Sequence, residues 1–319
     1  MKKLLTIAIP TYNRSNYVEE KLVWLSEALK GFESDCEIII TDNCSTDNTQ
    51  EIVEKYQDKF NNMQFIYKRQ EKNLGVMFNI AYCLDNATSE YVWVIGDDDP
   101  IRVDAIAYII ENITKHPEIS LIFLNFSCRH IPTGEILYEH CYNIEQDELR
   151  QDGKAIFEHN FKTNNSSVGF MTAQVYRTTV AKAALHSWDS GLANKETQVY
   201  WTAYCAMQGS VLTSKENYVE NAFGVSHWMR DPKLLLTMQY TDLPGIYIKL
   251  MELGYPSNYC LGLLIRHFFK NNWRVFFGAL RRYPKFAIAV IIPYLKLVAS
   301  AAWRMVLPPQ PVTTKFSNN

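Results

Sequence analysis

The sequence contains no aspartate or glutamate after Glu252, although nine lysines and arginines follow that residue. The other 23 lysines and arginines lie before it, together with all 34 acidic residues, so the first part of the chain has a net charge of −11. The chain therefore has an acidic body and a basic tail. This asymmetry predicts that the tail has an anionic partner.

The seven cysteines include no Cys-x-x-Cys pair and show no other spacing typical of a metal site. Their odd number argues against a disulfide framework, and a reducing compartment such as the cytoplasm is the simpler interpretation. No internal repeat or low-complexity stretch is visible. A composition of 47% apolar and 21% charged residues is typical of a globular protein.

The first residues have too short an apolar run for a signal peptide, and no small-residue cleavage site follows it. We expect residues 4–9 to form a strand that Pro10 ends. Residues 15–30 place Val18, Leu22 and Leu25 on one helical face, and Ser15 or Asn16 is expected to cap that helix.

Strand-like and helix-like segments continue to alternate through the first half of the chain. Short connections between them predict a largely parallel α/β sheet flanked by helices, with right-handed crossovers. The further strands are expected at residues 37–41, 64–68, 91–95 and 120–126.

Residues 91–100, Tyr-Val-Trp-Val-Ile-Gly-Asp-Asp-Asp-Pro, are the most informative stretch. A β-branched and aromatic run reads as a strand buried on both faces, and Gly96 and Pro100 bracket three carboxylates at its end. Three adjacent acids repel one another unless a divalent cation or another cationic group shares their charge. The carboxyl edge of an open sheet is also where ligands bind.

Three further polar motifs follow strand-like runs. Residues 9–14 read Ile-Pro-Thr-Tyr-Asn-Arg, residues 41–49 read Thr-Asp-Asn-Cys-Ser-Thr-Asp-Asn-Thr, and residues 73–75 read Asn-Leu-Gly, with Asn79 close behind. In this order and spacing, together with the acidic cluster, they resemble the GT-A glycosyltransferases of family 2. Members of that family use nucleotide-sugar donors to build polysaccharides and glycoconjugates.

The resemblance implies a GT-A catalytic domain over residues 1–230 and a helical, basic and apolar region over residues 231–319. Residues 1–126 would hold the nucleotide sugar and residues 127–230 the acceptor. Pro10, Thr11 and Tyr12 would line the base, and Asp42 would accept from its ring NH. Asn73 and Gly75 would let the chain approach the nucleotide closely, and the motifs also place Arg14, Asn43 and Asn79 in the donor site.

The acidic cluster departs from the usual Asp-x-Asp-Asp pattern of the family, because Gly96 stands where the first acid is common. In this register Asp97 would lie beside the ribose and Asp98 would bind Mg²⁺ or Mn²⁺. A shift by one residue would instead make Asp99 the metal ligand. His227 matches a late histidine that some GT-A enzymes place on the metal, although a lone histidine is more often structural.

The general base is less well defined. Inverting members often carry Glu-Asp, whose second acid is the base, but here Glu196 is followed by Thr197. Glu196 is the first candidate for a base that takes the proton of an acceptor hydroxyl, and Asp189 is the second. A Glu that merely begins a helix is the structural alternative.

These features lead to one functional interpretation and two rivals. The interpretation is metal-dependent, inverting transfer of a sugar from a nucleoside diphosphate to a glycan or polyprenyl-linked acceptor. A sugar nucleotidyltransferase is disfavoured because no Gly-rich loop with Arg and Lys follows the first strand. A non-catalytic nucleotide-sugar-binding relative would fit Thr197 at the base position.

The tail contains a long apolar run at residues 286–303, with Lys296 as its only charge. Pro293 and Lys296 near its middle disfavour a membrane-spanning helix. Flanking basic residues instead favour peripheral contact with an anionic membrane, so we expect a cytoplasmic protein on the inner face of the cell membrane. Packing in the core or an oligomer interface through the C-terminal helices is the alternative. We expect no nucleic-acid partner.

Overall fold

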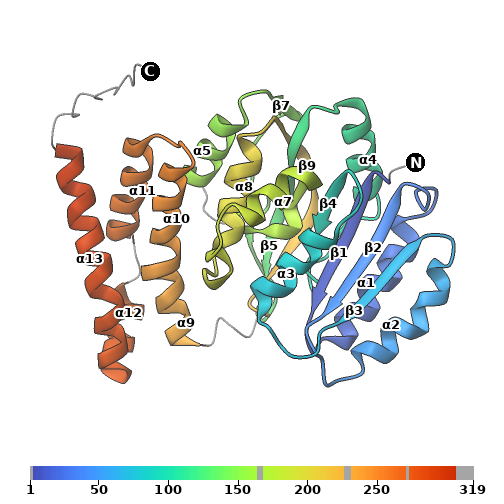
Figure 1. Ribbon diagram of the computed structural model, residues 1–319, viewed down its shortest axis with the longest axis horizontal. Helices are drawn as coiled ribbons and strands as arrows, with labels where there is room; N and C mark the ends of the chain where they lie inside the picture. The colour runs from blue at the N-terminus through green and yellow to red at the C-terminus, as the bar shows by residue number, and fades with distance from the viewer. Residues whose placement is uncertain (1–2, 164–167, 226–230, 271–272, 307–319) are drawn as a thin grey trace, which may run out of the picture. The chain divides into compact units, whose positions relative to one another are not determined.

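The computed structural model describes residues 3–163, 168–225, 231–270 and 273–306 of the chain. The polypeptide divides into two compact units, Met1–His227 and Trp228–Asn319. The first unit is built on a mixed sheet with helices on both faces, and the second is helical (Figure 1). The α/β fold with a helical C-terminal region, as predicted from the sequence, is confirmed.

Four parallel strands form the N-terminal half of the sheet, in the order β3-β2-β1-β4. Strand β8 then pairs antiparallel with both β4 and β5, and the sheet continues through β9 to β7, with β6 on β5. The strands are β1 (Leu5–Thr11), β2 (Cys36–Asp42), β3 (Gln64–Arg69), β4 (Tyr91–Val94), β5 (Ile119–His130), β6 (Glu135–Tyr138), β7 (Glu148–Arg150), β8 (Gln174–Arg177) and β9 (Ser210–Phe223).

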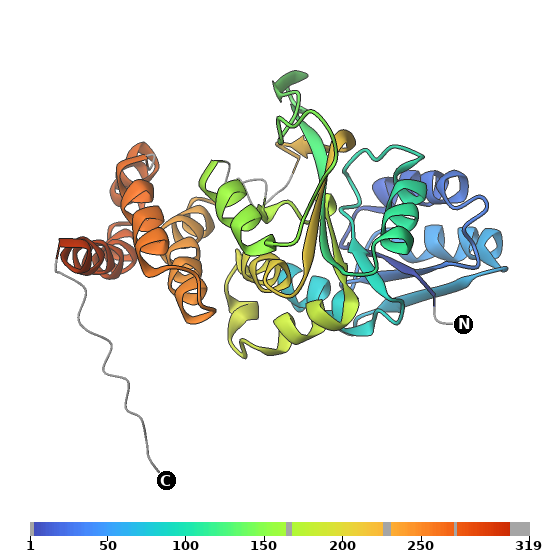
Figure 2. The ribbon, with the colours of Figure 1, turned by 90° about the horizontal axis from the view of Figure 1, so that it is seen from above.

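Helices cover both faces of this sheet. As Figures 1 and 2 show, α1, α2 and α4 lie on one face, and α3, α7 and α8 lie on the other. The helices of the first unit are α1 (Ser15–Ala28), α2 (Thr49–Gln57), α3 (Val76–Asn86), α4 (Ala105–Lys115), α5 (Gly153–Thr163), α7 (Thr178–His186) and α8 (Thr197–Ala206), with short 3₁₀ turns η1 (Asp58–Phe60), η2 (Met171–Ala173) and η3 (Gly191–Ala193).

Burial on two faces explains why the central strands have no polar side. All seven residues of β2 are buried, and β4 is buried throughout. Since β1, β2, β3 and β4 run in parallel, their carboxyl ends meet at one edge of the sheet. Thr11 pairs with Asp42, and Asp42 with Arg69, so the polar ends of three strands are in register there.

The second unit consists of α9 (Pro232–Thr237), a π-helical turn η5 (Met238–Asp242), α10 (Leu243–Glu252), α11 (Ser257–Lys270), α12 (Trp273–Arg282) and α13 (Pro284–Val306). Helix α13 packs on α9, α11 and α12. Its buried face carries Ala287, Ile291, Tyr294, Val298 and Ala301, at spacings of three and four residues. Among the described residues, α13 is the one helix long and apolar enough to cross a membrane.

Candidate donor site at the sheet edge

The acidic turn after β4 shares a cation with the turn after β1. Arg14 Nη1 lies 2.6 Å from Asp97 Oδ1 and 2.9 Å from Asp98 Oδ2. Thr11 Oγ1 donates to the other oxygen of Asp97 at 2.8 Å. Burial opposes the charge of Arg14, but the two carboxylates outweigh it and raise the Arg14 pKa, while burial raises the pKa of Asp97. The structure thus brings Thr11, Arg14, Asp97 and Asp98 together where the turns after β1 and β4 meet.

Asp99 does not share the Arg14 guanidinium with Asp97 and Asp98; a different set of residues encloses it. Its Oδ2 accepts from Thr172 Oγ1 at 2.5 Å, and its Oδ1 accepts from the Ala222 amide at 3.3 Å. The buried Lys21 ammonium donates to the Asp99 carbonyl oxygen. Burial, followed by the charge of Asp98, raises the pKa of Asp99 to about 7. The Asp99 carboxyl is therefore engaged in holding the turn against η2 and β9.

This orientation of Asp99 explains the glycine at the start of the cluster. A Cβ placed on Gly96 would lie 2.5 Å from Asp99 Oδ2, a separation at which one of the two must move. Thr172 Oγ1 also accepts from the Gly96 amide at 2.9 Å. Asp98 keeps the more open side chain, with 13% of its surface exposed against 4% for Asp97. Sequence reasoning missed Thr172 and Lys21, because nothing local to either one indicates a role.

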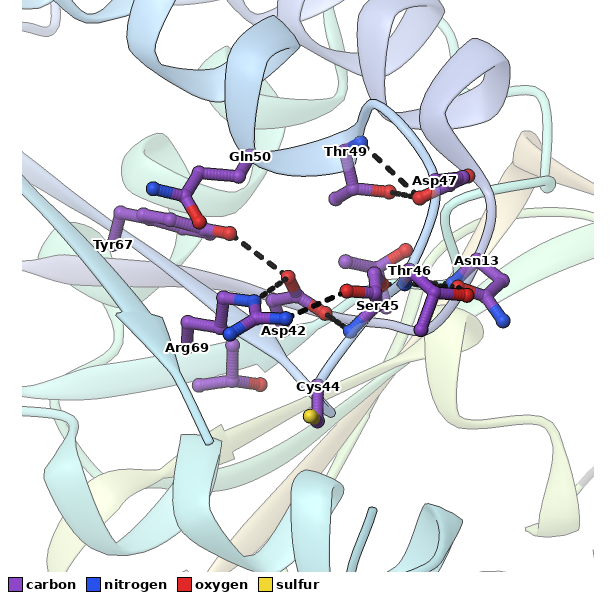
Figure 3. Close-up of polar contacts among 12 residues, drawn as sticks. Asn13, Asp42, Cys44, Ser45, Thr46, Asp47, Thr49, Gln50, Tyr67 and Arg69 are labelled. Atoms are coloured by element: carbon purple, nitrogen blue, oxygen red, sulfur yellow. Dashed lines mark hydrogen bonds and ion pairs between the residues drawn. The ribbon is translucent and has the colours of Figure 1, made fainter. Parts of the chain in front are cut away.

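Asp42, at the end of β2, has both carboxylate oxygens engaged within the protein (Figure 3). The Ser45 amide donates to Oδ1 at 2.8 Å, and Tyr67 Oη donates to Oδ2 at 2.8 Å. Arg69 Nε lies 3.7 Å from Oδ2, and the Asp42 side chain is fully buried. Burial of the Tyr67 hydroxyl, followed by its hydrogen bond to Asp42, raises the pKa of Tyr67. Tyr67 and Arg69 were not predicted; their position at the end of β3, the neighbour of β2, was the available signal.

The turns after β1 and β2 hold each other in place (Figure 3). Asn13 Oδ1 accepts from the Thr46 amide at 2.7 Å, and the Asn13 amide donates to Ser45 Oγ at 2.8 Å. Asn13 has a φ of 53° and Cys44 a φ of 68°, values that L-residues adopt rarely and that these contacts sustain.

The start of α1 differs from the sequence prediction. Neither Ser15 nor Asn16 caps the helix; instead Asp47 Oδ2, from the turn after β2, accepts from the Ser15 amide at 3.0 Å. The other oxygen of Asp47 accepts from the Thr49 amide at 3.1 Å, at the start of α2. One carboxylate therefore satisfies amides at two helix N-termini, where negative charge is favoured.

Asn43, Asn73 and Gly75 form a second network beside the acidic turn. Asn73 Oδ1 accepts from Asn43 Nδ2 at 2.9 Å and from the Gly75 amide at 2.8 Å, and Asn43 Oδ1 accepts from the Leu74 amide at 2.9 Å. Gly75 has a φ of 89°, which a side chain would disfavour. Asn79 Nδ2 donates to the carbonyl oxygens of Thr41 and Thr11 at 2.8 and 3.3 Å. Within the described chain, the buried Asn79 Oδ1 has no hydrogen-bond partner.

A cavity of about 380 Å³ adjoins this network and extends along α3. Asp189, the second base candidate, lies in its wall, whereas Glu196 lies immediately before α8. The cavity is lined by Asn43, Gln70, Leu74, Phe78, Asn79, Ala81, Tyr82, Asp85, Leu185, His186, Trp188, Asp189 and Leu192.

Thr197, where the family pattern has its base, is fully buried, and its hydroxyl has no partner within the described residues. Of the other predicted positions, Pro10 is half-buried and Tyr12 is 42% exposed at the β1 end. His227 lies outside the described residues. Among those that the structure describes, no three His, Cys, Asp or Glu side chains are grouped as a complete metal site.

Residues 6–182 match the family model described as Glycosyl transferase family 2. Since this match covers more than half of the chain, the chain belongs to glycosyl transferase family 2. It is 34% identical over 158 residues to "Abequosyltransferase RfbV" of Salmonella typhimurium, covering 49% of this chain and 45% of that protein. It is also 34% identical over 122 residues to "Poly(ribitol-phosphate) beta-N-acetylglucosaminyltransferase TarS" of Staphylococcus aureus, covering 37% of this chain and 20% of that protein. The chain thus aligns with less than half of either relative.

Solved structures share the fold over more of the chain. The S. aureus TarS fragment 1–349, in complex with UDP-GlcNAc, superposes with a TM-score of 0.68 and 18% identity, covering 92% of this chain and 81% of that one. The mannosyltransferase PcManGT from Pyrobaculum calidifontis, in complex with GDP-Man and Mn²⁺, gives a TM-score of 0.55 at 14% identity, covering 96% and 86%. At these identities the likeness shows the fold alone, and the fold prediction is confirmed.

Proposed function

We propose that this protein transfers a sugar from a nucleoside diphosphate donor to a hydroxyl of a glycan or lipid-linked acceptor. The observation that carries the proposal is the convergence of Arg14, Asp97 and Asp98 at the carboxyl edge of parallel strands. Its support comes from the transferase names of the two relatives and from neighbours in complex with UDP-GlcNAc and GDP-Man.

The donor would lie across the strand-end turns of residues 1–126. In this proposal Pro10, Thr11 and Tyr12 contact the base, and Asp97 contacts the ribose. The Asp42 side chain is fully buried, so it reaches the base only if a neighbouring side chain such as Tyr67 or Arg69 moves aside. Asn43, Asn73 and Gly75 shape the edge of the pocket through their mutual hydrogen bonds, and Asn79 donates to the Thr41 and Thr11 carbonyl oxygens beside them.

The acidic turn fits Mg²⁺ or Mn²⁺ in the manner of phosphate-bound metals, which use one or two carboxylates and complete their shell with phosphate oxygens and water. Asp98 is the ligand we propose, because its carboxylate is the most open of the three. The alternative ligand Asp99 would have to leave Thr172 and Ala222. Such a cation would stabilise the negative charge of the departing diphosphate. The Arg14 guanidinium would also stabilise the negative charge of the departing diphosphate.

Residues 127–230 would hold the acceptor. We propose that Glu196 takes the proton of the attacking hydroxyl as its oxygen bonds to the anomeric carbon and the bond to the diphosphate oxygen breaks. Asp189 is the alternative base. A single displacement of this kind inverts the configuration at that carbon.

A binding protein without transfer activity is the second candidate, and Thr197 is the observation that favours it. A buried threonine cannot act as a carboxylate base, and its hydroxyl has no partner in the described structure. In that case donor binding would persist, and Glu196 would be only the residue that precedes α8.

The helical unit, residues 231–319, would rest on an anionic membrane surface at the cytoplasmic face. The outer face of α13 leaves Ile288, Ile292 and Leu295 exposed by 46%, 46% and 42%, and Trp303 by 66%. Lys285, Lys296 and Arg304 are exposed on the same helix. Exposed apolar side chains next to cations fit an anionic membrane, in which negatively charged headgroups cover an apolar interior. An oligomer formed through this face is the alternative.

The donor proposal is tested by thermal unfolding with sugar nucleotides, with and without Mn²⁺. A ligand that binds only the folded state raises the apparent stability, so at least one sugar nucleotide should raise Tm, and Mn²⁺ should enlarge the rise. Release of nucleoside diphosphate then separates transfer or hydrolysis from mere binding. If no sugar nucleotide shifts Tm, the donor proposal is wrong.

A further inference from the structure

The cavity along α3 lies outside the cluster of Arg14, Asp97 and Asp98, none of which lines it. It begins near Asn43 and Gln70 at the carboxyl edge of the sheet. From there it follows α3 as far as Asp85, six residues beyond Asn79, which is about 9 Å along the helix axis. Its opposite wall is formed by the segment from Leu185 to Leu192. The cavity therefore extends from the proposed donor site to residues 185–192, within the part of the chain proposed to hold the acceptor.

Three aromatic side chains line this cavity. Phe78 is 49% exposed, and Tyr82 and Trp188 are half-buried. The Trp188 ring is fixed by an edge contact with Tyr200 at 5.2 Å and by a hydrogen bond from Nε1 to Ser190 Oγ at 3.0 Å. Ring faces held in this way offer flat apolar surface to a ligand that has apolar faces of its own.

The cavity wall contains hydrogen-bond acceptors that a ligand could use. Within the described residues Asp189 makes no hydrogen bond or ion pair, and Asn79, only 4% exposed, has an unpartnered Oδ1. No lysine or arginine lines the cavity. Its one imidazole belongs to His186, whose Nε2 lies 2.9 Å from Asp85 Oδ1. A phosphate or another anion would find no free cation here. An alkyl chain would strip water from the exposed Asp189 carboxylate without replacing its hydrogen bonds, which is unfavourable.

We propose that this cavity binds a neutral saccharide portion of the acceptor glycan, a ligand rich in hydroxyl donors with apolar ring faces. Sugar hydroxyls donate to the exposed Asp189 carboxylate, while the pyranose faces pack on Phe78, Tyr82 and Trp188. The end of the cavity at Asn43 and Gln70 would place the end of such a chain next to the proposed donor site. The inference rests on the proposed transfer to a glycan.

The test uses the whole 319-residue chain on an array of neutral bacterial oligosaccharides. Phe78→Ala and Tyr82→Ala each remove an aromatic face from the cavity wall, and we expect each to weaken the bound glycan signal by about tenfold. Val23→Ala is the matched control, because Val23 is 47% exposed on α1 and lies outside the cavity. Thermal unfolding with sugar nucleotides is measured on all four proteins in parallel.

The inference is supported if the wild type and Val23→Ala bind the same neutral glycan and the two cavity variants lose it while keeping their sugar-nucleotide Tm shift. It is overturned if the wild type binds no neutral glycan, or if the cavity variants bind it as strongly as the control. In those cases an intact Tm shift leaves the donor proposal standing. Absence of any Tm shift in the wild type would instead count against the donor proposal.

Discussion

The charged side chains at the sheet edge of the first unit are enclosed and paired, whereas those on the outer face of α13 are exposed to solvent. At the sheet edge Arg14, Lys21, Asp97 and Asp99 are buried or nearly so, and each is joined to partners from distant parts of the chain. On α13, Lys285 and Lys296 are exposed, and no acid follows Glu252 in the sequence. Enclosed, paired charges fix the geometry of a site. Exposed cations attract an anionic surface without fixing its position.

This difference predicts two kinds of response to substitution. At the sheet edge, loss of one carboxylate should have a large effect that salt does not reverse, because the groups around it are desolvated and unscreened. On α13, each lost cation should have a small, additive effect that disappears at high salt.

The largest expected effect is that of Asp98→Asn. We expect turnover to fall by about 10³-fold and the Mn²⁺-dependent part of the sugar-nucleotide Tm shift to disappear, since electrostatic stabilisation of a leaving group is worth several kcal/mol. Steady-state release of nucleoside diphosphate and thermal unfolding measure the two quantities. The fold should survive, because Asp98 is the most open acid of the cluster.

Asp104→Asn is the control for Asp98→Asn, since Asp104 is an exposed acid paired with Arg102 just beyond the turn. Full activity of Asp98→Asn, together with loss of Mn²⁺ binding in Asp99→Asn, would contradict the proposed ligand. The metal would then be bound in the register shifted by one residue.

The second effect is that of Glu196→Gln, for which we expect kcat to fall by about 10²–10⁴-fold. The sugar-nucleotide Tm shift should remain, because Glu196 is assigned to the acceptor. Asp189→Asn is measured beside it. Undiminished kcat in Glu196→Gln with a loss in Asp189→Asn would transfer the role of base to Asp189. Undiminished kcat in both variants would show that another group is the base, and absence of turnover in the wild type would favour the binding-protein alternative.

The third effect is a pH dependence confined to the helical unit. Burial lowers the pKa of His267 to about 4 in the folded state, and its Nδ1 lies 2.8 Å from Tyr294 Oη of α13. The histidine pKa in the unfolded chain is near 6.5, so between about pH 6.5 and pH 4 the unfolded chain binds a proton that the folded chain does not bind. Stability should therefore fall as the pH drops from about 6.5 to about 4, by up to about 3 kcal/mol.

Amide hydrogen exchange of α11 and α13, followed between pH 7 and pH 4, measures this loss. His267→Gln should flatten the dependence, whereas the exposed His140→Gln in the first unit should leave it unchanged. Equal acid sensitivity of α11 in the wild type and in His267→Gln would show that another group is responsible.

The smallest effect is expected for Lys285→Gln combined with Lys296→Gln. Each cation near an anionic leaflet contributes about 1 kcal/mol, so binding to phosphatidylglycerol vesicles at low salt should weaken by about 30-fold. Deletion of α13 would be a poorer test, because its inner face, with Tyr294, forms part of the core of the helical unit. If the unaltered protein does not bind such vesicles at low salt, the exposed face belongs to an oligomer interface.

Much of the fold follows from the sequence. Strands buried on both faces read as continuous apolar runs, and the polar residues that end them mark the carboxyl edge of the sheet. Residues 9–14, 41–49 and 96–99 could be assigned to that edge because parallel strands bring their ends together. The amphipathic pattern of the first helix likewise predicted which of its residues are buried, including Val18, Leu22 and Leu25.

Contacts between strand-end turns could not be predicted in the same way. Asp47, which reads as a helix-capping residue of its own turn, also satisfies the Ser15 amide 32 positions earlier. Asp42 acquires Tyr67 and Arg69 only because β3 lies next to β2. The cavity along α3 is likewise formed by segments that are more than a hundred positions apart, since Asn43 and Asp189 share its wall.

The sequence by itself determined that three carboxylates stand at the end of a buried strand, because local pattern and proline placement are properties of neighbouring residues. Only the tertiary structure decided that Asp97 and Asp99 turn inward while Asp98 stays more open. Thr172 and the Ala222 amide, 73 and 123 positions from Asp99, enclose its carboxyl and leave no room for a side chain on Gly96. Burial by distant segments, and not the order of the acids, thus separates the enclosed Asp99 from the more open Asp98.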